Sequence, residues 1–223
     1  MRNIIFQIGE YYHIFNRGVD KRNIFMDKKD YIRFLVCMRE FNDIEPVKSL
    51  YIKKKLEKQK NLNRGLAPLR GAKPLRTPLV EFVAYNLLPN HNHFILKQLV
   101  DGGISEFMKR LSGGYTCYFN QKYNRTGSLF EGTFKAVLIN SNEYLLYLSA
   151  YINGNSEIHK IIIARNWPWS SYKDYFGFRS GTLCNKKVIT EQFKNIYEYK
   201  DLVNIIVKES QERKEEIKKY LLE

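Results

Sequence analysis

The pattern of hydrophobic and polar positions predicts four β-strands. Each stretch is rich in β-branched and aromatic residues and is bounded by turn-forming residues. The four stretches are residues 10–16, 80–87, 91–99 and 133–139. Leu88-Pro-Asn90 separates the second stretch from the third, so we expect a short hairpin-like connection between two antiparallel strands.

Apolar residues recur at helical spacing between and after these strands. Asp27 to Asp30 supply start residues for a first helix, and a second helix follows Gly102-Gly103. Gly113-Gly114 should weaken this second helix by about 1 kcal/mol per glycine relative to alanine. Asn140 to Glu143 form an N-cap for a third helix, and the chain is again helical from about Thr190.

The order of these elements predicts an α+β fold. Strand, helix, strand, strand, helix, strand, helix is close to the split β-α-β arrangement of ferredoxin-like folds, with an antiparallel sheet and helices on one face. We expect one domain over residues 1–176 and a C-terminal helical extension over residues 177–223. Residues 46–78 are basic and rich in glycine and proline, which indicates a flexible insertion.

Charge and composition narrow the function. The 223 residues carry a formal net charge of +14, and a basic surface of this kind usually binds nucleic acid, although a solvated lysine-rich surface is the alternative. The three cysteines are far apart, so neither a disulfide framework nor a zinc site is indicated. No signal-peptide pattern and no apolar run of membrane-spanning length occurs in the sequence, so we expect a cytoplasmic protein.

His91 and His93 are the first candidates for chemistry. They lie two positions apart in a predicted strand, so both side chains should point to the same face and could chelate one divalent ion. Two histidines in a strand are also often plain surface or core residues, and the spacing alone leaves both interpretations open.

Tyr151 and Asn155 are the second candidates. They are four residues apart on a predicted helix, which places a phenol and an amide on one face. A tyrosine can attack a phosphate covalently if its proton is removed and a metal polarises the phosphate. The chain has 16 tyrosines, so a packing role for Tyr151 is the alternative.

Six blocks of the sequence, in this order, resemble the signature blocks of the REP-associated tyrosine transposases, a group of single-tyrosine HUH transposases with an IS200-like transposase domain. The blocks are Tyr12-His-Ile-Phe-Asn-Arg-Gly18, Leu88-Pro-Asn-His-Asn-His93, Gly114-Tyr-Thr-Cys-Tyr-Phe-Asn120, Gly127-Ser-Leu-Phe-Glu-Gly-Thr-Phe-Lys135, Tyr144-Leu-Leu-Tyr-Leu-Ser-Ala-Tyr-Ile152 and Trp167-Pro-Trp-Ser-Ser-Tyr172. Together they cover nearly all of residues 11–176. The basic insertion is the one large interruption.

The resemblance implies a function and a site. Residues 1–176 would form the catalytic domain of a hairpin- or sequence-specific single-strand DNA endonuclease and strand-transferase. His91 and His93 would bind Mg²⁺ or Mn²⁺ with Asn155 as a third ligand, and Tyr151 would be the nucleophile that forms a 5′-phosphotyrosine intermediate. The partner would be single-stranded DNA with a hairpin, at a repeat or an element end.

Basic residues outside the HUH strand are candidates for phosphate contacts. They are Arg17, Lys21, Arg22, Lys109, Arg110, Lys122, Arg125 and Lys135. Tyr123 or Phe130 could stack on unpaired bases.

The chain departs from the family pattern at two places. Asn92 stands where an apolar residue is usual, so its amide needs a partner or a wetter face of the sheet. The block Tyr151-Ile-Asn-Gly-Asn-Ser156 lacks the histidine and the proline that commonly follow the nucleophile and carries a helix-weakening glycine.

Two other functions compete with this interpretation. A non-catalytic single-strand nucleic-acid-binding protein could use the same basic and aromatic surface, but has no need of His91, His93 and Tyr151 together. A hydrolase of small phosphoesters would need acidic ligands near the histidines, and none lies close in the sequence. Whether the protein acts as a monomer or a homodimer stays open.

Overall fold

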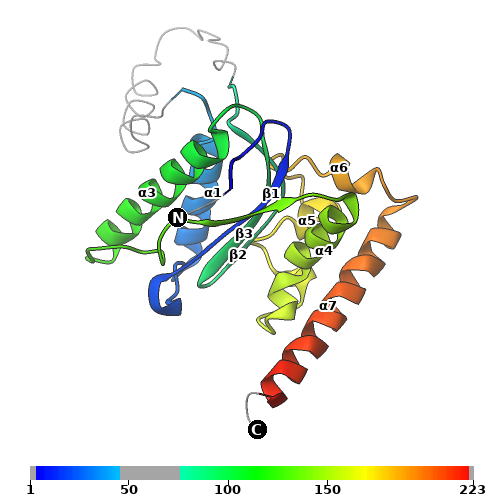
Figure 1. Ribbon diagram of the computed structural model, residues 1–223. Coiled ribbons are helices and arrows are strands. Elements are labelled where there is room, and N and C mark those ends of the chain that lie inside the picture. Colours follow the sequence, from blue (N-terminus) through cyan, green and yellow to red (C-terminus); the bar gives the residue numbers. More distant parts are fainter. Residues whose placement is uncertain (1–3, 46–75, 221–223) are drawn as a thin grey trace, which may run out of the picture.

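Four strands form one antiparallel sheet in the computed structural model, which describes residues 4–45 and 76–220 (Figure 1). The strands are β1 (Tyr11–Arg17), β2 (Val80–Leu88), β3 (His91–Gln98) and β4 (Lys135–Ile139). Their order across the sheet is β2-β3-β1-β4. This order, with a helix between β1 and β2 and another between β3 and β4, confirms the expected α+β, ferredoxin-like arrangement. Residues 46–75 of the expected insertion lie outside the described residues.

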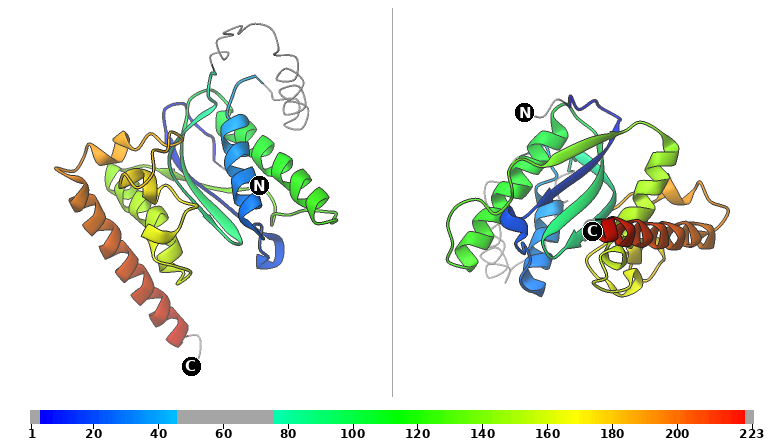
Figure 2. Two further views of the ribbon diagram at one scale, coloured as in Figure 1. Left: turned by 180° about the vertical axis from the view of Figure 1, so that it is seen from behind. Right: turned by 60° about the horizontal axis from the view of Figure 1, so that its bottom comes forward.

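Helices cover both faces of the sheet, which corrects the expectation that they lie on one face. The long helices are α1 (Lys28–Glu40), α3 (Gly103–Lys122), α4 (Asn142–Ile158) and α7 (Ile196–Tyr220). The expected arrangement holds for α1 and α3, whereas α4 packs on the opposite face and α7 packs on α4 (Figures 1 and 2). Helix α4 needs a second apolar surface of the sheet, and Val83, Ala84 and Ile95 supply it.

Short helices complete the described part of the chain. They are η1 (Val19–Lys21), η2 (Ala164–Asn166), α5 (Tyr172–Tyr175) and α6 (Lys187–Thr190). None of the helices in the described ranges is both long and apolar enough to span a membrane.

The alternation of side chains along β3 divides the core in two. Phe94 and Leu96 pack against α1 and α3, and Ile95 packs with α4 on the other side. By the same alternation, His91 and His93 share the α4 side with Ile95. Strand β3 is paired on both edges, to β1 and to β2, so this orientation is fixed by two registers.

Asn92 faces the α1 and α3 side of the sheet and is 1% exposed. Its Oδ1 accepts no hydrogen bond from the residues that the structure describes. The amide oxygen of Asn92 therefore has neither the hydrogen-bond partner nor the wetter surroundings expected from the sequence. A buried polar atom without a partner lowers the stability of the fold by about 1–3 kcal/mol.

Two glycines let helices approach closely. Helix α3 runs without a break through Gly113-Gly114, and a Cβ on Gly114 would lie 2.6 Å from the ring of Phe41, next to the end of α1. In α4, a Cβ on Gly154 would lie 2.4 Å from Cγ2 of Val207 on α7. Gly154, which the sequence suggested would weaken α4, is the residue that lets α7 pack closely on it.

Alanine at Gly154 and at Gly113 should therefore change stability in opposite directions. A Cβ on Gly113 meets nothing within 4 Å, so Gly113→Ala should raise the free energy of unfolding by up to about 1 kcal/mol through helix propensity. Gly154→Ala should lower it by about 1–3 kcal/mol, because stiff, branched Val207 must move away. Urea unfolding of both variants measures the two effects. A stabilising Gly154→Ala would contradict the packing of α7 on α4.

Candidate active site at the histidine cluster

All four histidines of the chain gather on the α4 side of the sheet. His13 lies on β1, His91 and His93 on β3, and His159 follows the end of α4. Their rings form a row: the centroid distances are 5.2 Å from His13 to His93, 5.0 Å from His93 to His91 and 5.1 Å from His91 to His159. Residues separated by up to 146 positions are thus neighbours because β1 and β3 pair and α4 ends beside them.

Hydrogen bonds orient three of these rings, those of His91, His93 and His13. Nδ1 of His91 lies 2.6 Å from Oδ1 of Asn90, whose Nδ2 donates to the carbonyl of Lys21. Oδ1 can only accept, so Nδ1 of His91 carries the proton and its Nε2 keeps a lone pair. Nδ1 of His93 lies 2.9 Å from Nε2 of His13. If His93 donates there, its own Nε2 is also available as a ligand.

Burial keeps the histidines uncharged. It lowers the pKa of His13 and that of His91 to about 4. The pKa of His93 lies well below 6.5, first through burial and then through the neighbouring His13. At neutral pH each of these imidazoles is therefore neutral and has one nitrogen lone pair to offer.

Tyr151 lies on α4, over the same face of the sheet. Its ring centroid is 6.3 Å from that of His93, and it stacks on Tyr147, which in turn stacks on Tyr144. Burial raises the pKa of Tyr151, while the amide of Asn155 partly offsets this rise. The phenol is consequently protonated in the free protein.

Asn155 lies one turn after Tyr151 on α4 and is fully buried. Its side-chain amide is near enough to Tyr151 to offset part of the rise that burial causes in the pKa of that phenol, but neither amide atom makes a hydrogen bond of good geometry with a described residue. Such an orphaned amide costs free energy unless something binds it. A hard divalent cation accepts an amide oxygen as a ligand.

The donor set near His91 and His93 fits a divalent ion of intermediate softness. Neutral imidazoles and an amide carbonyl are ligands that Mn²⁺ accepts, and Mg²⁺ accepts the oxygen. Over residues 4–45 and 76–216, no group of three or more His, Cys, Asp or Glu side chains is arranged to hold a metal. A site here would have to combine the histidine pair with the amide of Asn155 and with oxygens from outside the protein.

A cavity of about 580 Å³ opens beside the cluster. Its walls are formed by Phe15, Asn16, Arg17, Asn90, His91, His93, Glu131, Thr133, Lys135 and His159. Arg17 donates from Nε and Nη2 to the Glu131 carboxylate, at 2.8 and 3.2 Å. Of the eight basic residues predicted to bind DNA, Arg17 and Lys135 line this cavity.

The other predicted DNA contacts lie elsewhere. Lys122 forms ion pairs with Asp27 and with fully buried Asp30. Further basic side chains bind close neighbours: Arg22 pairs with Asp20, Lys109 and Arg110 with Glu106, and Arg125 donates to Asn120. Lys21 belongs to η1, next to Asn90.

Aromatic residues in the α3–β4 connection also differ from expectation. Phe130 is 5% exposed and part of the core, so stacking on a base through Phe130 was a wrong prediction. The hydroxyl of Tyr123 donates to Asp30, and its ring stays partly exposed.

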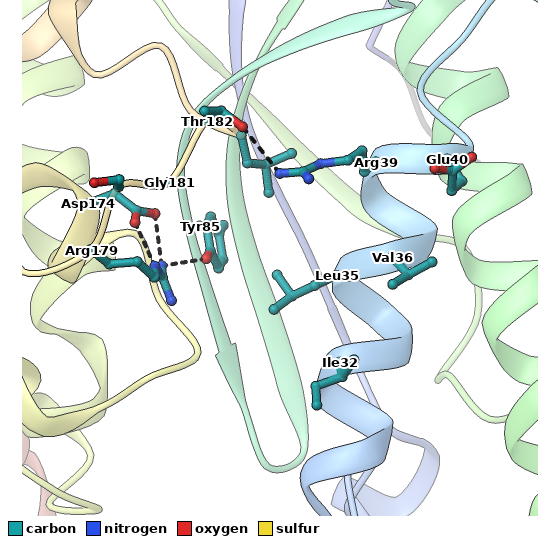
Figure 3. A pocket seen from close by; sticks show the side chains of 12 residues that line it. Ile32, Leu35, Val36, Arg39, Glu40, Tyr85, Asp174, Arg179, Gly181 and Thr182 are labelled. Atoms are coloured by element: carbon teal, nitrogen blue, oxygen red, sulfur yellow. Dashed lines mark hydrogen bonds and ion pairs between the residues drawn. The ribbon is translucent and has the colours of Figure 1, made fainter. Parts of the chain in front are cut away.

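A second cavity, of about 430 Å³, lies between α1 and residues 179–183 (Figure 3). Its wall includes exposed Ile32 and Val36 of α1. Arg179 is held by Asp174 and the hydroxyl of Tyr85 (Figure 3). This arginine ties the 179–183 segment to β2. We interpret the second cavity as the space left between this segment and α1, and we assign it no binding role.

Sequence reasoning missed His13, His159 and Glu131. His13 lies inside the first block of the family resemblance and faces the same way as Phe15, so strand alternation could have found it. His159 lies one helical turn beyond Asn155, so its spacing of four residues from Asn155 could have placed it on the same helix face. Nothing in the local sequence of Glu131 indicates that it pairs with Arg17, 114 positions away.

The lowered histidine pKa values predict the pH dependence of stability. In the unfolded chain, histidine takes up a proton below a pH of about 6.5, but His13 in the folded protein does so only near 4. The unfolded state binds more protons between these values, so the free energy of unfolding should fall as the pH is lowered through this window. From about pH 7 to pH 5, in EDTA, wild type should lose about 1–2 kcal/mol more than His13→Gln. Urea titrations measure the loss, and equal losses would contradict the buried, neutral His13.

Comparison with known proteins is consistent with this geometry. Residues 75–155 match the family model described as "Transposase IS200 like". The matched stretch contains His91, His93, Tyr151 and Asn155. The sequence matches none of the curated proteins.

Among solved structures, the chain is similar to a REP-associated tyrosine transposase bound to a REP hairpin. The two share 15% sequence identity, with a TM-score of 0.49, and the alignment covers 79% of this chain and 85% of the other. The resemblance expected from the sequence blocks is confirmed for residues 75–155, which match the model of the IS200-like transposases.

Proposed function

We propose that this protein is a single-strand DNA endonuclease and strand-transferase of the transposase kind, with Tyr151 as nucleophile. Its substrate is single-stranded DNA with a hairpin, recognised by structure or by sequence. His91, His93 and Asn155 hold Mg²⁺ or Mn²⁺. The proposal rests on one observation above all: the ring of Tyr151 lies beside that of His93, with centroids 6.3 Å apart.

Several features of the site support the metal part of the proposal. The two imidazoles are neutral and adjacent, and the Asn155 amide is buried without a hydrogen-bond partner. When bound, a divalent ion would polarise the scissile phosphate and favour loss of the phenol proton. The Asn90 amide would keep His91 in the required tautomer, as outer residues of metal sites commonly do.

Tyr151 performs the covalent step. Its Oη attacks phosphorus, a P–O bond to the phenol forms, and the P–O3′ bond of the DNA breaks. The phenol loses its proton, and the departing 3′ oxygen gains one. The 5′-phosphotyrosine keeps the energy of the phosphodiester, so the free 3′-hydroxyl of the same or of another strand can reverse the step without an external energy source.

The protein environment restrains this nucleophile until DNA is bound. Burial raises the pKa of Tyr151, so the free protein holds an unreactive phenol. The stack of Tyr151 on Tyr147 fixes the ring on α4, and Arg17 and Lys135 place positive charge on the cavity wall. A phosphate entering the cavity is attracted by those cations to the wall that His93 helps to form, and the Tyr151 ring lies next to His93.

Removing the phenol oxygen should abolish covalent chemistry. Tyr151→Phe should form no SDS-resistant adduct with labelled single-stranded hairpins from the ends of its own gene, while its affinity for these hairpins stays within about twofold of wild type. Tyr147→Phe is the matched control, because Tyr147 lies one turn earlier on the same face of α4. Adduct formation by Tyr151→Phe, or its loss only in Tyr147→Phe, would contradict the assignment. Hairpin binding without any adduct in wild type would favour the binding-only alternative.

Removing a metal ligand should abolish both metal binding and cleavage. His91→Ala should weaken Mn²⁺ binding at least about tenfold in calorimetry, since a lost ligand or its support costs this much, and EDTA should stop adduct formation by wild type. His159→Ala is the control for Mn²⁺ binding alone: it removes a histidine of the same cluster that is not a proposed ligand, so its Mn²⁺ affinity in calorimetry should equal that of wild type. Equal Mn²⁺ binding by His91→Ala and wild type, or cleavage in EDTA, would refute the metal site.

A further inference from the structure

Helix α7 lies beyond the stretch matched by the family, yet it runs along α4 to the histidine cluster (Figures 1 and 2). One stripe of α7 makes this contact, at the helical spacing of four, four and three residues. Val203 and Val207 are buried in the α4 core, and Nε2 of Gln211 donates to the carbonyl of Glu157 at 2.8 Å. The next residue of the stripe is Lys214.

Lys214 contacts the outermost histidine of the row. Its Nζ lies 3.3 Å from Nε2 of His159. An ammonium group has no lone pair, so Lys214 is the donor and Nε2 of His159 is the acceptor. His159 lines the cavity of the histidine cluster and also a smaller hollow that Lys214 lines, so the imidazole stands between the lysine and the cavity. An ion pair between Lys160 and Glu215 fixes the same part of α7 to the end of α4.

The charge around this position favours an anion. Arg17 and Lys135 line the cavity, and Glu131, the one carboxylate among the described residues of its wall, is paired with Arg17. Lys214 lies close to the cluster, because its Nζ is 3.3 Å from His159, whose ring centroid is 5.1 Å from that of His91. Glu131 offsets one of the three positive charges of Arg17, Lys135 and Lys214, so net positive charge remains beside the neutral imidazoles, and a phosphodiester would compensate it.

We propose that Lys214 binds a backbone phosphate of the single-stranded DNA next to the scissile one, and that His159 is the positioning residue that holds its ammonium group. Helix α7 is then part of the DNA-binding site. The inference rests on the proposed function for the location of the scissile phosphate. The phosphate contact of Lys214 itself does not depend on cleavage, because binding measurements alone detect it.

Affinity in a cleavage-deficient background tests the contact. In the Tyr151→Phe protein, Lys214→Gln should weaken binding of a labelled hairpin from the ends of its gene about fivefold. The slope of log affinity against log salt should become shallower by about 0.7, the value for one phosphate contact on a single strand. Lys214→Arg should keep the slope. Lys208→Gln is the matched control, since Lys208 is an exposed lysine of the same helix, six residues earlier, and its loss should leave the slope within about 0.2 of the parent.

Uncharged methylphosphonate linkages locate the contact. One linkage next to the cleavage position should weaken binding to the parent protein but not further weaken binding to Lys214→Gln. In His159→Gln, the methylphosphonate should weaken binding less than it does in the parent protein. A histidine with a purely structural role would leave this effect of the methylphosphonate unchanged. Circular dichroism confirms that each variant is folded.

The outcomes separate the two proposals. If Lys214→Gln keeps the slope of the parent, or loses no more than Lys208→Gln, the contact is refuted even where wild type forms an adduct. If the slope changes as expected but wild type never forms an adduct, the phosphate contact stands and the nuclease proposal fails. If the Lys214-intact protein binds no hairpin, both fail.

Discussion

The pairing of β3 with both of its neighbours is the constraint on which the site depends. Register with β1 and β2 forces Phe94 and Leu96 into the core under α1 and α3 and turns His91 and His93 toward α4. A slip by one residue would bury the histidines among the aromatic side chains and send Phe94 into the cavity. Hydrophobic burial on one face therefore sets the position of the polar groups on the other.

The packing of α7 on α4 explains where the chain departs from the family pattern after its tyrosine. Gly154 leaves room for Val207, and the side chain of Asn153 donates to the hydroxyl of Tyr199 while accepting from Ser171. A larger or charged side chain at these positions would collide with α7 or lose buried partners. The altered block is thus adapted to the C-terminal helix, and the fully buried Asn155 within it has no hydrogen-bond partner of good geometry among the described residues.

Sequence patterns predicted the elements well, because local rules govern them: alternation gives the strands, Asp27 and Ser141 cap α1 and α4 as expected, and the hairpin falls at Pro89-Asn90. The side of the sheet that each helix covers depends on long-range packing, which is why α4 was misplaced. His13 belongs to the cluster through its contact with His93, 80 positions later, and His159 through its contact with His91, 68 positions earlier. No local pattern encodes such contacts. Strand alternation predicts that His91 and His93 lie together, and helical spacing predicts the same for Tyr151 and Asn155. The metal-binding and nucleophilic roles of these four residues stay predictions.

The identity of the covalently modified residue is the most direct test. Wild-type protein would be incubated with hairpin DNA and Mn²⁺, the adduct isolated under denaturing conditions and digested with trypsin and nuclease, and the modified peptide sequenced by mass spectrometry. A nucleotide attached through phosphate to Tyr151, within the tryptic peptide 136–160, is the expected result. Modification of Tyr144 or Tyr147 in that peptide, or of any residue outside it, would contradict the proposed nucleophile.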